Sequence, residues 1–264
     1  MKILRLVSMA LALFLLGGCA SESYKQIKTI NQLNNPIYKI GGSAETESYR
    51  IACQRFTIAD HVPFGSMLQL IPALQMEKID GAVFDRPSLD YAAALYGDLV
   101  VLPENLAPGQ VAIATSYDNE ALMSKVNAFI KQYREDGTYQ KMYKHWIKTP
   151  HAKMPKIAEA KNPVGVLRVG TETANIPLNY LDREENLIGF NIEFAKRLAL
   201  YLNMKLELDV MEYSELCAAA GTKKVDLAIA SIDVTDANRN LVLFSDEYID
   251  CPVAVMVRKE KKND

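Results

Sequence analysis

The chain has 264 residues, of which 49% are hydrophobic and 23% charged, and its 30 basic and 32 acidic residues give a formal net charge of −2. These values exclude wholesale disorder, and the length suits one large domain or two modest lobes. The balanced charge gives no positive field for nucleic acid, so no nucleic-acid partner is expected. With three histidines in the chain, neither a multi-histidine metal site nor a cofactor is expected.

The first twenty residues have the pattern of a secretory signal. Lys2 and Arg5 accompany an apolar run at 6–16 that is too short for a good membrane-spanning helix. The sequence Leu-Gly-Gly-Cys at 16–19 resembles the bacterial lipobox, which implies a signal peptide over 1–19 and acylation of Cys19. The mature chain would then be extracytoplasmic and lipid-anchored. The alternative is an ordinary signal peptide with an incidental cysteine.

Three cysteines remain beyond Cys19, namely Cys53, Cys217 and Cys251. They allow at most one disulfide and leave at least one thiol free. No CxxC pair and no metal-ligand spacing is present, so we interpret them as three buried small hydrophobic residues.

Short apolar strands alternate with helical stretches along the chain, which predicts an α/β protein with mainly parallel sheets. The predicted strands are, in chain order, 38–40, 82–84, 99–102, 111–114, 166–170, 205–210, 225–230 and 251–257. The predicted helices are 45–55, 66–78, 89–96, 120–135, 139–147, 191–202, 213–221 and 236–241.

Two connecting segments are recognised by composition. Residues 61–64 are interpreted as a connector, and the polar, proline-containing run 148–163 as a linker. Residues 73–83 and 219–229 share one pattern, which is a helix, a basic turn, an apolar residue, an aspartate and a strand. Two similar lobes side by side would produce this repetition.

Four ordered motifs lie at 167–172, 187–196, 225–229 and 244–248. Together they closely resemble the first lobe of family 3 extracytoplasmic solute-binding proteins, the amino-acid receptors of ABC importers. Residues 25–150 resemble the rest of the family through 79–85 and 136–146. The resemblance implies the periplasmic binding protein-like type II fold, with two α/β lobes joined by a hinge.

The order of the two lobes is inverted relative to the family, because this chain starts with the second lobe. We interpret the chain as circularly permuted; the alternative is two truncated, unrelated halves. The implied second lobe comprises 24–108 plus 252–264, and the first lobe comprises 109–251. The latter contains return helices at 120–147, the linker 148–163 and a core at 164–251.

The resemblance implies a ligand between the lobes, where lobe closure completes the site. Asp85 follows the predicted strand 82–84, and its carboxylate would hold a ligand ammonium; the alternative role is a helix N-cap. Gly42 and Ser43 belong to a turn expected between a strand and a helix, near which the family binds a carboxylate. Ser43 is alternatively only a helix cap.

Three candidate residues come from the first lobe. Glu172 and Tyr213 would face the cleft, where Tyr213 would pack flat on an apolar part of the ligand. The alternative for Tyr213 is ordinary packing in the core or at the rim. Asn175 stands where many family members carry an aromatic residue that stacks on the ligand.

The motif 231–239 departs from the family. Ser231 remains a candidate ligand residue, but Asp233 replaces the usual threonine and Asn238 the arginine that clamps the ligand's α-carboxylate. Arg239 comes one residue after the position of the family's arginine, which on a helix turns its side chain by about 100°. Either Arg239 turns in and the ligand is a zwitterionic amino acid, or the ligand is cationic or poorly carboxylated.

The sequence therefore predicts a monomeric, lipid-anchored solute-binding protein that captures an amino acid or related amine for an ABC permease. It is not expected to be an enzyme. Two alternatives remain: a cyclohexadienyl dehydratase-like enzyme with Glu172 as general acid, or a ligand-sensing receptor for a membrane signalling partner.

Overall fold

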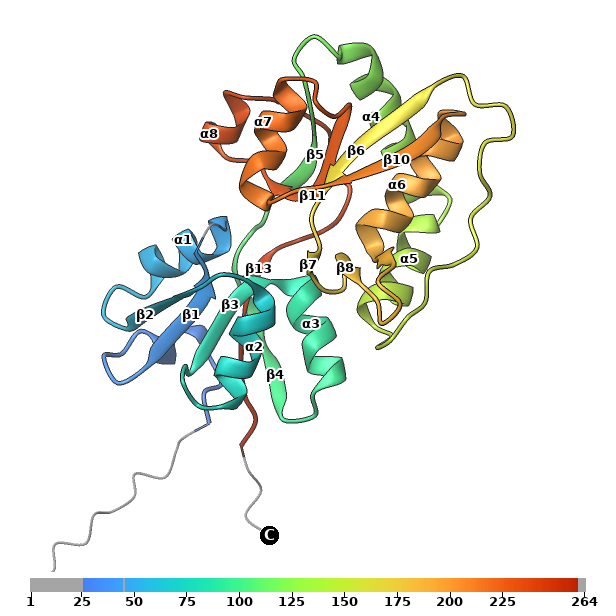
Figure 1. The fold of residues 1–264 in the computed structure, drawn as a ribbon. Helices are drawn as coiled ribbons and strands as arrows, with labels where there is room; N and C mark the ends of the chain where they lie inside the picture. Colours follow the sequence, from blue (N-terminus) through green and yellow to red (C-terminus); the bar gives the residue numbers. More distant parts are fainter. Residues whose placement is uncertain (1–25, 45, 261–264) are drawn as a thin grey trace, which may run out of the picture.

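The computed structural model describes residues 26–44 and 46–260, so the predicted signal peptide and Cys19 lie outside the described residues. This part of the chain contains two five-stranded sheets and one small three-stranded sheet. Helices cover both faces of each five-stranded sheet, which gives two α/β units side by side (Figure 1).

Sheet A has the strand order β2-β1-β3-β13-β4. Strand β1 (Lys39–Ser43) pairs in parallel with β2 (Asp60–Phe64) and β3 (Gly81–Asp85). Strand β13 (Val253–Arg258) lies antiparallel between β3 and β4 (Leu99–Ala107). The run Val-Ala-Val-Met-Val in β13 is apolar throughout because helices cover both faces of this interior strand.

Sheet B has the same layout, in the order β10-β6-β11-β5-β12. Strand β6 (Val166–Thr171) is parallel to β10 (Lys205–Val210) and β11 (Leu227–Asp233). Strand β5 (Val111–Thr115) is antiparallel to β11 and β12 (Leu243–Phe244). The small sheet consists of β7 (Ala174–Asn175), β8 (Asn179–Leu181) and β9 (Leu187–Ile188).

The helices of sheet A bury an apolar stripe on each side of the sheet. Helix α1 (Glu47–Arg55) and the short η1 (Ile30–Leu33) pack on one face. Helices α2 (Met67–Gln75) and α3 (Arg86–Leu95) pack on the other.

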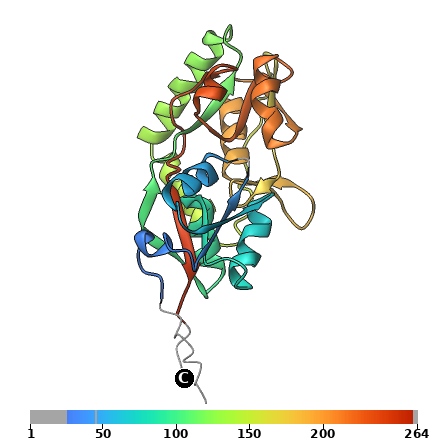
Figure 2. The ribbon, with the colours of Figure 1, turned by 90° about the vertical axis from the view of Figure 1, so that its left-hand side faces the viewer.

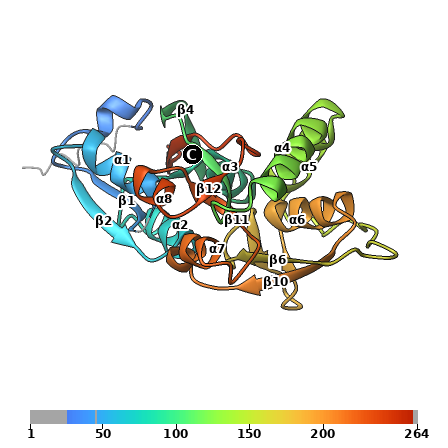
Figure 3. The same cartoon turned by 90° about the horizontal axis from the view of Figure 1, so that it is seen from above.

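Sheet B carries α4 (Glu120–Glu135), α5 (Thr138–Ile147) and α6 (Phe190–Tyr201) on one face (Figure 3). The other face is covered by η2 (Tyr213–Glu215) and α7 (Leu216–Gly221), with α8 (Asp236–Arg239) nearby.

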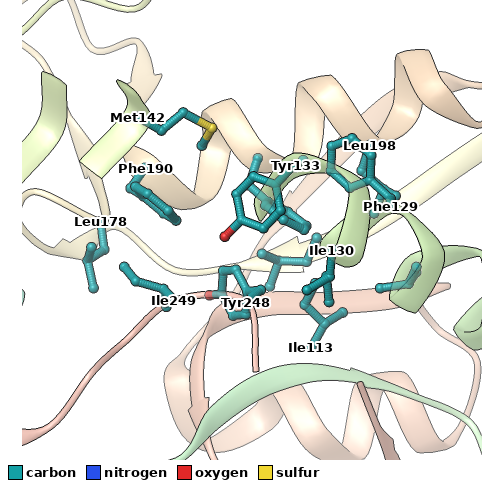
Figure 4. Packing of buried hydrophobic residues seen from close by; sticks show 14 of the residues in the cluster. Ile113, Phe129, Ile130, Tyr133, Met142, Leu178, Phe190, Leu198, Tyr248 and Ile249 are labelled. Atoms are coloured by element: carbon teal, nitrogen blue, oxygen red, sulfur yellow. The ribbon is translucent and has the colours of Figure 1, made fainter. Parts of the chain in front are cut away.

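An aromatic cluster fills the core between α4, α6 and sheet B (Figure 4). The ring of Phe194 lies 5.2 Å from the rings of both Phe129 and Tyr133, in edge-to-face geometry, and 5.0 Å from Tyr248. Such pairs add about 0.5–1.5 kcal/mol to the burial of the rings.

The chain crosses between the two units twice, through 108–110 after β4 and through 245–252 before β13. The two crossings run side by side (Figure 2, green and red). A Cβ added at Gly109 would lie 1.8 Å from the carbonyl oxygen of Cys251. Glycine at 109 therefore permits the close approach of the two backbones.

The α/β class and the two-sheet architecture predicted from the sequence are confirmed. The prediction of mainly parallel sheets is wrong, because each sheet receives an antiparallel fourth strand from the crossing chain. Residues 148–165 form no helix or strand, as predicted for the linker. Helix α4 and strand β10 have the predicted bounds.

Several local predictions need correction. The supposed connector 61–64 lies in β2, an edge strand that tolerates Pro63. Gly42 is a residue of β1 and not of a turn, and a Cβ there would lie 2.6 Å from the ring of Tyr49. Cys53 is exposed, whereas Cys217 and Cys251 are buried as predicted, and all three are free.

Candidate ligand-binding cavity

A cavity of about 310 Å³ lies between the two units. The residues that line it sit at or just beyond the carboxyl ends of β1, β2 and β3 of sheet A and of β6, β10 and β11 of sheet B. Ligands of open α/β sheets bind at these strand ends, and the volume suits a small molecule. The cavity is lined by Ser43, Thr46, Gly65, Ser66, Met67, Phe84, Asp85, Glu172, Thr173, Ala174, Asn175, Val210, Met211, Glu212, Tyr213, Ser231 and Asp233.

Asp85 is the last residue of β3 and is 8% exposed. It occupies the N-cap position of α3, but its side chain makes no capping hydrogen bond. Instead, Oδ1 accepts a hydrogen bond from Ser48 Oγ at 3.0 Å. Burial, with a smaller contribution from the negative charge of Asp233, raises the pKa of Asp85 to about 7.

Asp233, at the end of β11, connects the two units. Its Oδ2 accepts hydrogen bonds from the backbone N–H of Glu47 at 3.1 Å and from the Tyr213 hydroxyl at 3.2 Å. Glu47 is the first residue of α1, so a carboxylate from sheet B occupies the N-terminus of a helix that packs on sheet A. Burial raises the pKa of Asp233 to about 6, although the hydrogen bond from Glu47 opposes the shift.

Glu172 follows β6 and is 9% exposed. Both of its carboxylate oxygens accept hydrogen bonds from the chain itself, from the backbone N–H of Ala174 and from the side-chain amide of Asn179. Burial nevertheless raises the pKa of Glu172. Glu172 therefore holds the turn between β6 and β7 in place while it lines the cavity.

Ser231 belongs to a buried polar network behind the cavity wall. Its φ of 54° places it in the left-handed region, and its N–H donates to the Tyr248 hydroxyl at 3.0 Å. That hydroxyl donates to Asn191 Oδ1 at 2.8 Å, and Asn191 Nδ2 donates to Ser231 Oγ at 3.2 Å. These bonds stabilise a backbone conformation that serine rarely adopts.

Asn175 makes a second hydrogen bond between the units. Its Oδ1 accepts from the hydroxyl of Ser88, in the first turn of α3, at 2.8 Å. Asn175 is thus engaged with sheet A's unit. Tyr213 lines the cavity, and burial, reinforced by the charge of Asp233, raises the pKa of its hydroxyl.

Of the predicted site residues, seven come together around the cavity, namely Ser43, Asp85, Glu172, Asn175, Tyr213, Ser231 and Asp233. Gly42, Asn238 and Arg239 do not line it. The Asn238 amide donates to the carbonyl of Asp233 at 2.9 Å and so supports the turn after β11. Arg239 is exposed on the four-residue α8, so the structure does not bring it to the cavity.

Sequence reasoning missed several lining residues. Thr46 and Ser66 are the N-cap residues of α1 and α2, a position that a serine or threonine before an apolar periodic run can signal. Met67, Phe84 and Met211 carry no such signal, because apolar residues at the ends of strands and helices more often enter the core.

Two α/β units that face each other across a small polar cavity, with the carboxyl ends of their strands toward it, define the class. Two such units on either side of a cavity are what the sequence resemblance to the two-lobed periplasmic binding protein-like type II fold led us to expect. Residues 167–263 match the sequence model of bacterial extracellular solute-binding proteins, family 3. This segment, about a third of the chain, is therefore similar to that family, in the region where the sequence motifs lie.

Individual relatives are similar over part of the chain. A probable histidine-binding protein of Neisseria gonorrhoeae is 30% identical over 105 residues, 40% of this chain and 39% of that protein. The arginine-binding extracellular protein ArtP of Bacillus subtilis (strain 168) is 30% identical over 94 residues, 36% of each chain. This chain thus spans 36–39% of the length of these curated relatives.

Solved structures are also similar. The arginine-bound form of domain 1 from TmArgBP is 28% identical, with a TM-score of 0.31, and the match covers 38% of this chain and 84% of that one. A periplasmic substrate-binding protein of an ABC transporter from Coxiella burnetii is 15% identical, with a TM-score of 0.40, over 86% of this chain and 87% of that one.

Proposed function

We propose that this chain is a solute-binding protein that captures a small polar solute, an amino acid or a related amine, between two lobes for an ABC importer. The cavity carries this proposal, because both sheets contribute strand-end residues to it and neither sheet forms it alone. The family match at 167–263 and relatives named for histidine and arginine binding support an amino-acid-like solute.

The proposed lobes are 24–108 plus 252–264 and 109–251, joined by the paired crossings as a hinge. The permuted order is part of the proposal. Its support is that the chain enters sheet A's unit before β1 and leaves it after β13 at the same end of sheet A (Figure 1), so a direct connection from β13 to η1 would be short. A chain that starts at 164, joins 260 to 26 and ends at 150 should fold and bind the same solute.

Anchoring through Cys19 is also part of the proposal. None of the helices in 26–44 and 46–260 is long and apolar enough to cross a membrane. Replacement of Cys19 by serine should abolish incorporation of radiolabelled palmitate and release the protein from membranes. Retention of the Cys19→Ser chain in the membrane fraction would contradict the lipid anchor.

Binding is tested by thermal shift with the twenty amino acids and a set of amines. A ligand at 100 times its dissociation constant stabilises a protein by about 2.7 kcal/mol, a rise in melting temperature of about 5–10 °C. Asp85→Ala should abolish the rise, whereas Asp98→Ala, at an exposed position outside the cavity, should retain it. Absence of any rise would contradict a solute-binding role.

We propose binding without turnover. The two hydrogen bonds that Glu172 accepts engage both of its oxygens, which speaks against its use as a general acid. A prephenate or arogenate turnover assay tests this, since catalysis that Glu172→Gln removes would establish the enzyme instead. A ligand that binds but is not imported would favour the signalling receptor.

A further inference from the structure

The charged residues that line the cavity are all acidic. Four carboxyl groups line it, those of Asp85, Glu172, Glu212 and Asp233, and none of its described lining residues is basic. A ligand carboxylate would meet repulsion from several of these groups at close range. An ammonium group would meet attraction from the same groups.

The N-terminus of α1 opens onto the cavity through Thr46 and would ordinarily favour an anion. In this structure the carboxylate of Asp233 accepts the N–H of Glu47 there, at 3.1 Å. The protein itself therefore supplies the anion at this helix end. A ligand carboxylate would have to displace Asp233, which also accepts from Tyr213 at 3.2 Å.

Apolar side chains provide the remaining wall. Met67 and Phe84 come from sheet A's unit, and Val210, Met211 and the ring of Tyr213 from sheet B's. Methylene groups of a ligand would be buried against these side chains, and an aromatic ring also attracts an ammonium group. Within the described residues, no three His, Cys, Asp or Glu side chains are placed to hold a metal ion, which favours an organic cation.

We propose that the solute is an alkyl amine that carries ammonium groups and no carboxylate, with one ammonium held by Asp85 and Asp233. This inference rests on the proposed binding function and narrows its ligand class. Asp85 is buried and Asp233 is partly buried, and the described lining residues offer neither of them a basic partner. An ammonium group there would supply the missing opposite charge. The amino-acid part of the proposed ligand range is thereby excluded.

Two pairs of probes isolate the carboxylate. Isothermal titration of the full-length chain at pH 7.5 compares 1,4-diaminobutane with ornithine and 1,5-diaminopentane with lysine, each pair differing only by the α-carboxylate. We expect each diamine to bind at least tenfold more tightly than its amino acid. Equal or tighter binding of the amino acids would overturn the proposal.

Substitutions test whether Asp85 and Asp233 hold the ammonium group of the ligand. Asp233→Asn and Asp85→Asn, each verified as folded by circular dichroism, should each weaken diamine binding at least tenfold. Asp118→Asn is the matched control, because Asp118 pairs with Lys223 on the surface and lies outside the cavity. Unchanged diamine affinity in folded Asp233→Asn and Asp85→Asn would also overturn the proposal.

The binding results distinguish failure of the amine class from failure of the solute-binding function. Binding of any of the twenty amino acids without diamine binding would reject the amine class and leave the solute-binding function in place. If neither amino acids nor diamines bind, and no other amine shifts the melting temperature, the amine class and the proposed binding function both fail.

Discussion

The connection from α2 to β3 in sheet A and the connection from α7 to β11 in sheet B are built alike. Two residues beyond the end of each helix stands a residue in the left-handed region, Glu77 with φ 59° and Lys223 with φ 63°. An aspartate follows three residues later, Asp80 in one and Asp226 in the other. The repetition seen in the sequence is therefore a repetition of backbone geometry.

The two aspartates bond the neighbouring strand in the same way. Asp80 Oδ2 accepts the N–H of Lys39 at 3.0 Å, and Asp226 Oδ2 accepts the N–H of Arg168 at 2.8 Å. Their arginine partners differ. Asp226 pairs with Arg168 of the adjacent β6 at an exposed position, whereas Asp80 pairs with Arg258 of β13, which is 11% exposed.

The two units therefore depend on the rest of the chain in different ways. In sheet B the ion pair is local to two neighbouring strands. In sheet A the ion pair joins the α2–β3 connection to the strand that arrives last. Sheet B's unit also contains a buried polar network around Asn191 and Tyr248.

Both units depend on the close packing of the two crossings, and Gly109→Ala should disrupt that packing. A Cβ 1.8 Å from the Cys251 carbonyl forces the crossings apart, and we expect a loss of about 3 kcal/mol or more in the free energy of unfolding. Urea unfolding measures it. Gly97→Ala, where nothing lies within 4 Å, is the control and should cost little.

The contact between the units should also make stability depend on pH. The pKa of Asp85 is raised to about 7, above its value in the unfolded chain, so the folded state retains a proton that the unfolded state has released. The free energy of unfolding should fall by roughly 3 kcal/mol as pH rises from 4 to 8. Asp233, with a pKa of about 6, acts in the same direction.

Asp85→Asn tests this directly, because an amide cannot ionise. The variant should lose most of the fall in stability and exceed the parent protein in stability at pH 8. The charged or titratable neighbours of this pair, Glu47, Tyr213 and Cys251, remain unchanged in the variant. An undiminished pH dependence in Asp85→Asn would show that this group does not control it.

Two buried tyrosines of the same core test how much the polar network of sheet B's unit contributes to stability (Figure 4). Tyr248→Phe leaves the N–H of Ser231 and Oδ1 of Asn191 without their partner and should cost about 2–3 kcal/mol. In the described structure, the buried hydroxyl of Tyr133 has no hydrogen-bond partner, so Tyr133→Phe should be neutral or stabilising. Equal effects of the two substitutions would contradict the network's role.

The smallest effects distinguish the two aspartates. Asp80→Ala removes a backbone hydrogen bond and a mostly buried ion pair, and we expect a cost of about 2 kcal/mol. Asp226→Ala removes the same backbone bond but a more exposed pair, and should cost about 1 kcal/mol. Unfolding titrations of both variants measure the difference, which a reversed order would refute.

Strong local periodicity predicted the long elements well. Helix α4 shows apolar residues at 126, 129, 130 and 133, and its bounds were found from this spacing. The two- and three-residue strands β7, β8, β9 and β12 were missed, because pairing with neighbours, and not local pattern, makes them strands.

Predicting the site depended on tertiary geometry that the sequence does not contain. The family resemblance predicted Asp85, Glu172 and Asp233 as cleft residues, and the tendency of ligands to bind beyond the carboxyl ends of strands gave an independent reason to look there. The engagement of Asp233 with Glu47 spans 186 positions in the chain and has no local signature. The exposed position of Arg239 likewise follows from how the short α8 packs after β11.

The place of β13 between β3 and β4 has a consequence for biosynthesis. When the ribosome has produced residues up to β4, the first unit still lacks β13, the interior strand that joins β3 to β4, and the facing edges of β3 and β4 have no partner. The earliest part of the polypeptide must therefore wait for nearly the whole of translation before its architecture closes.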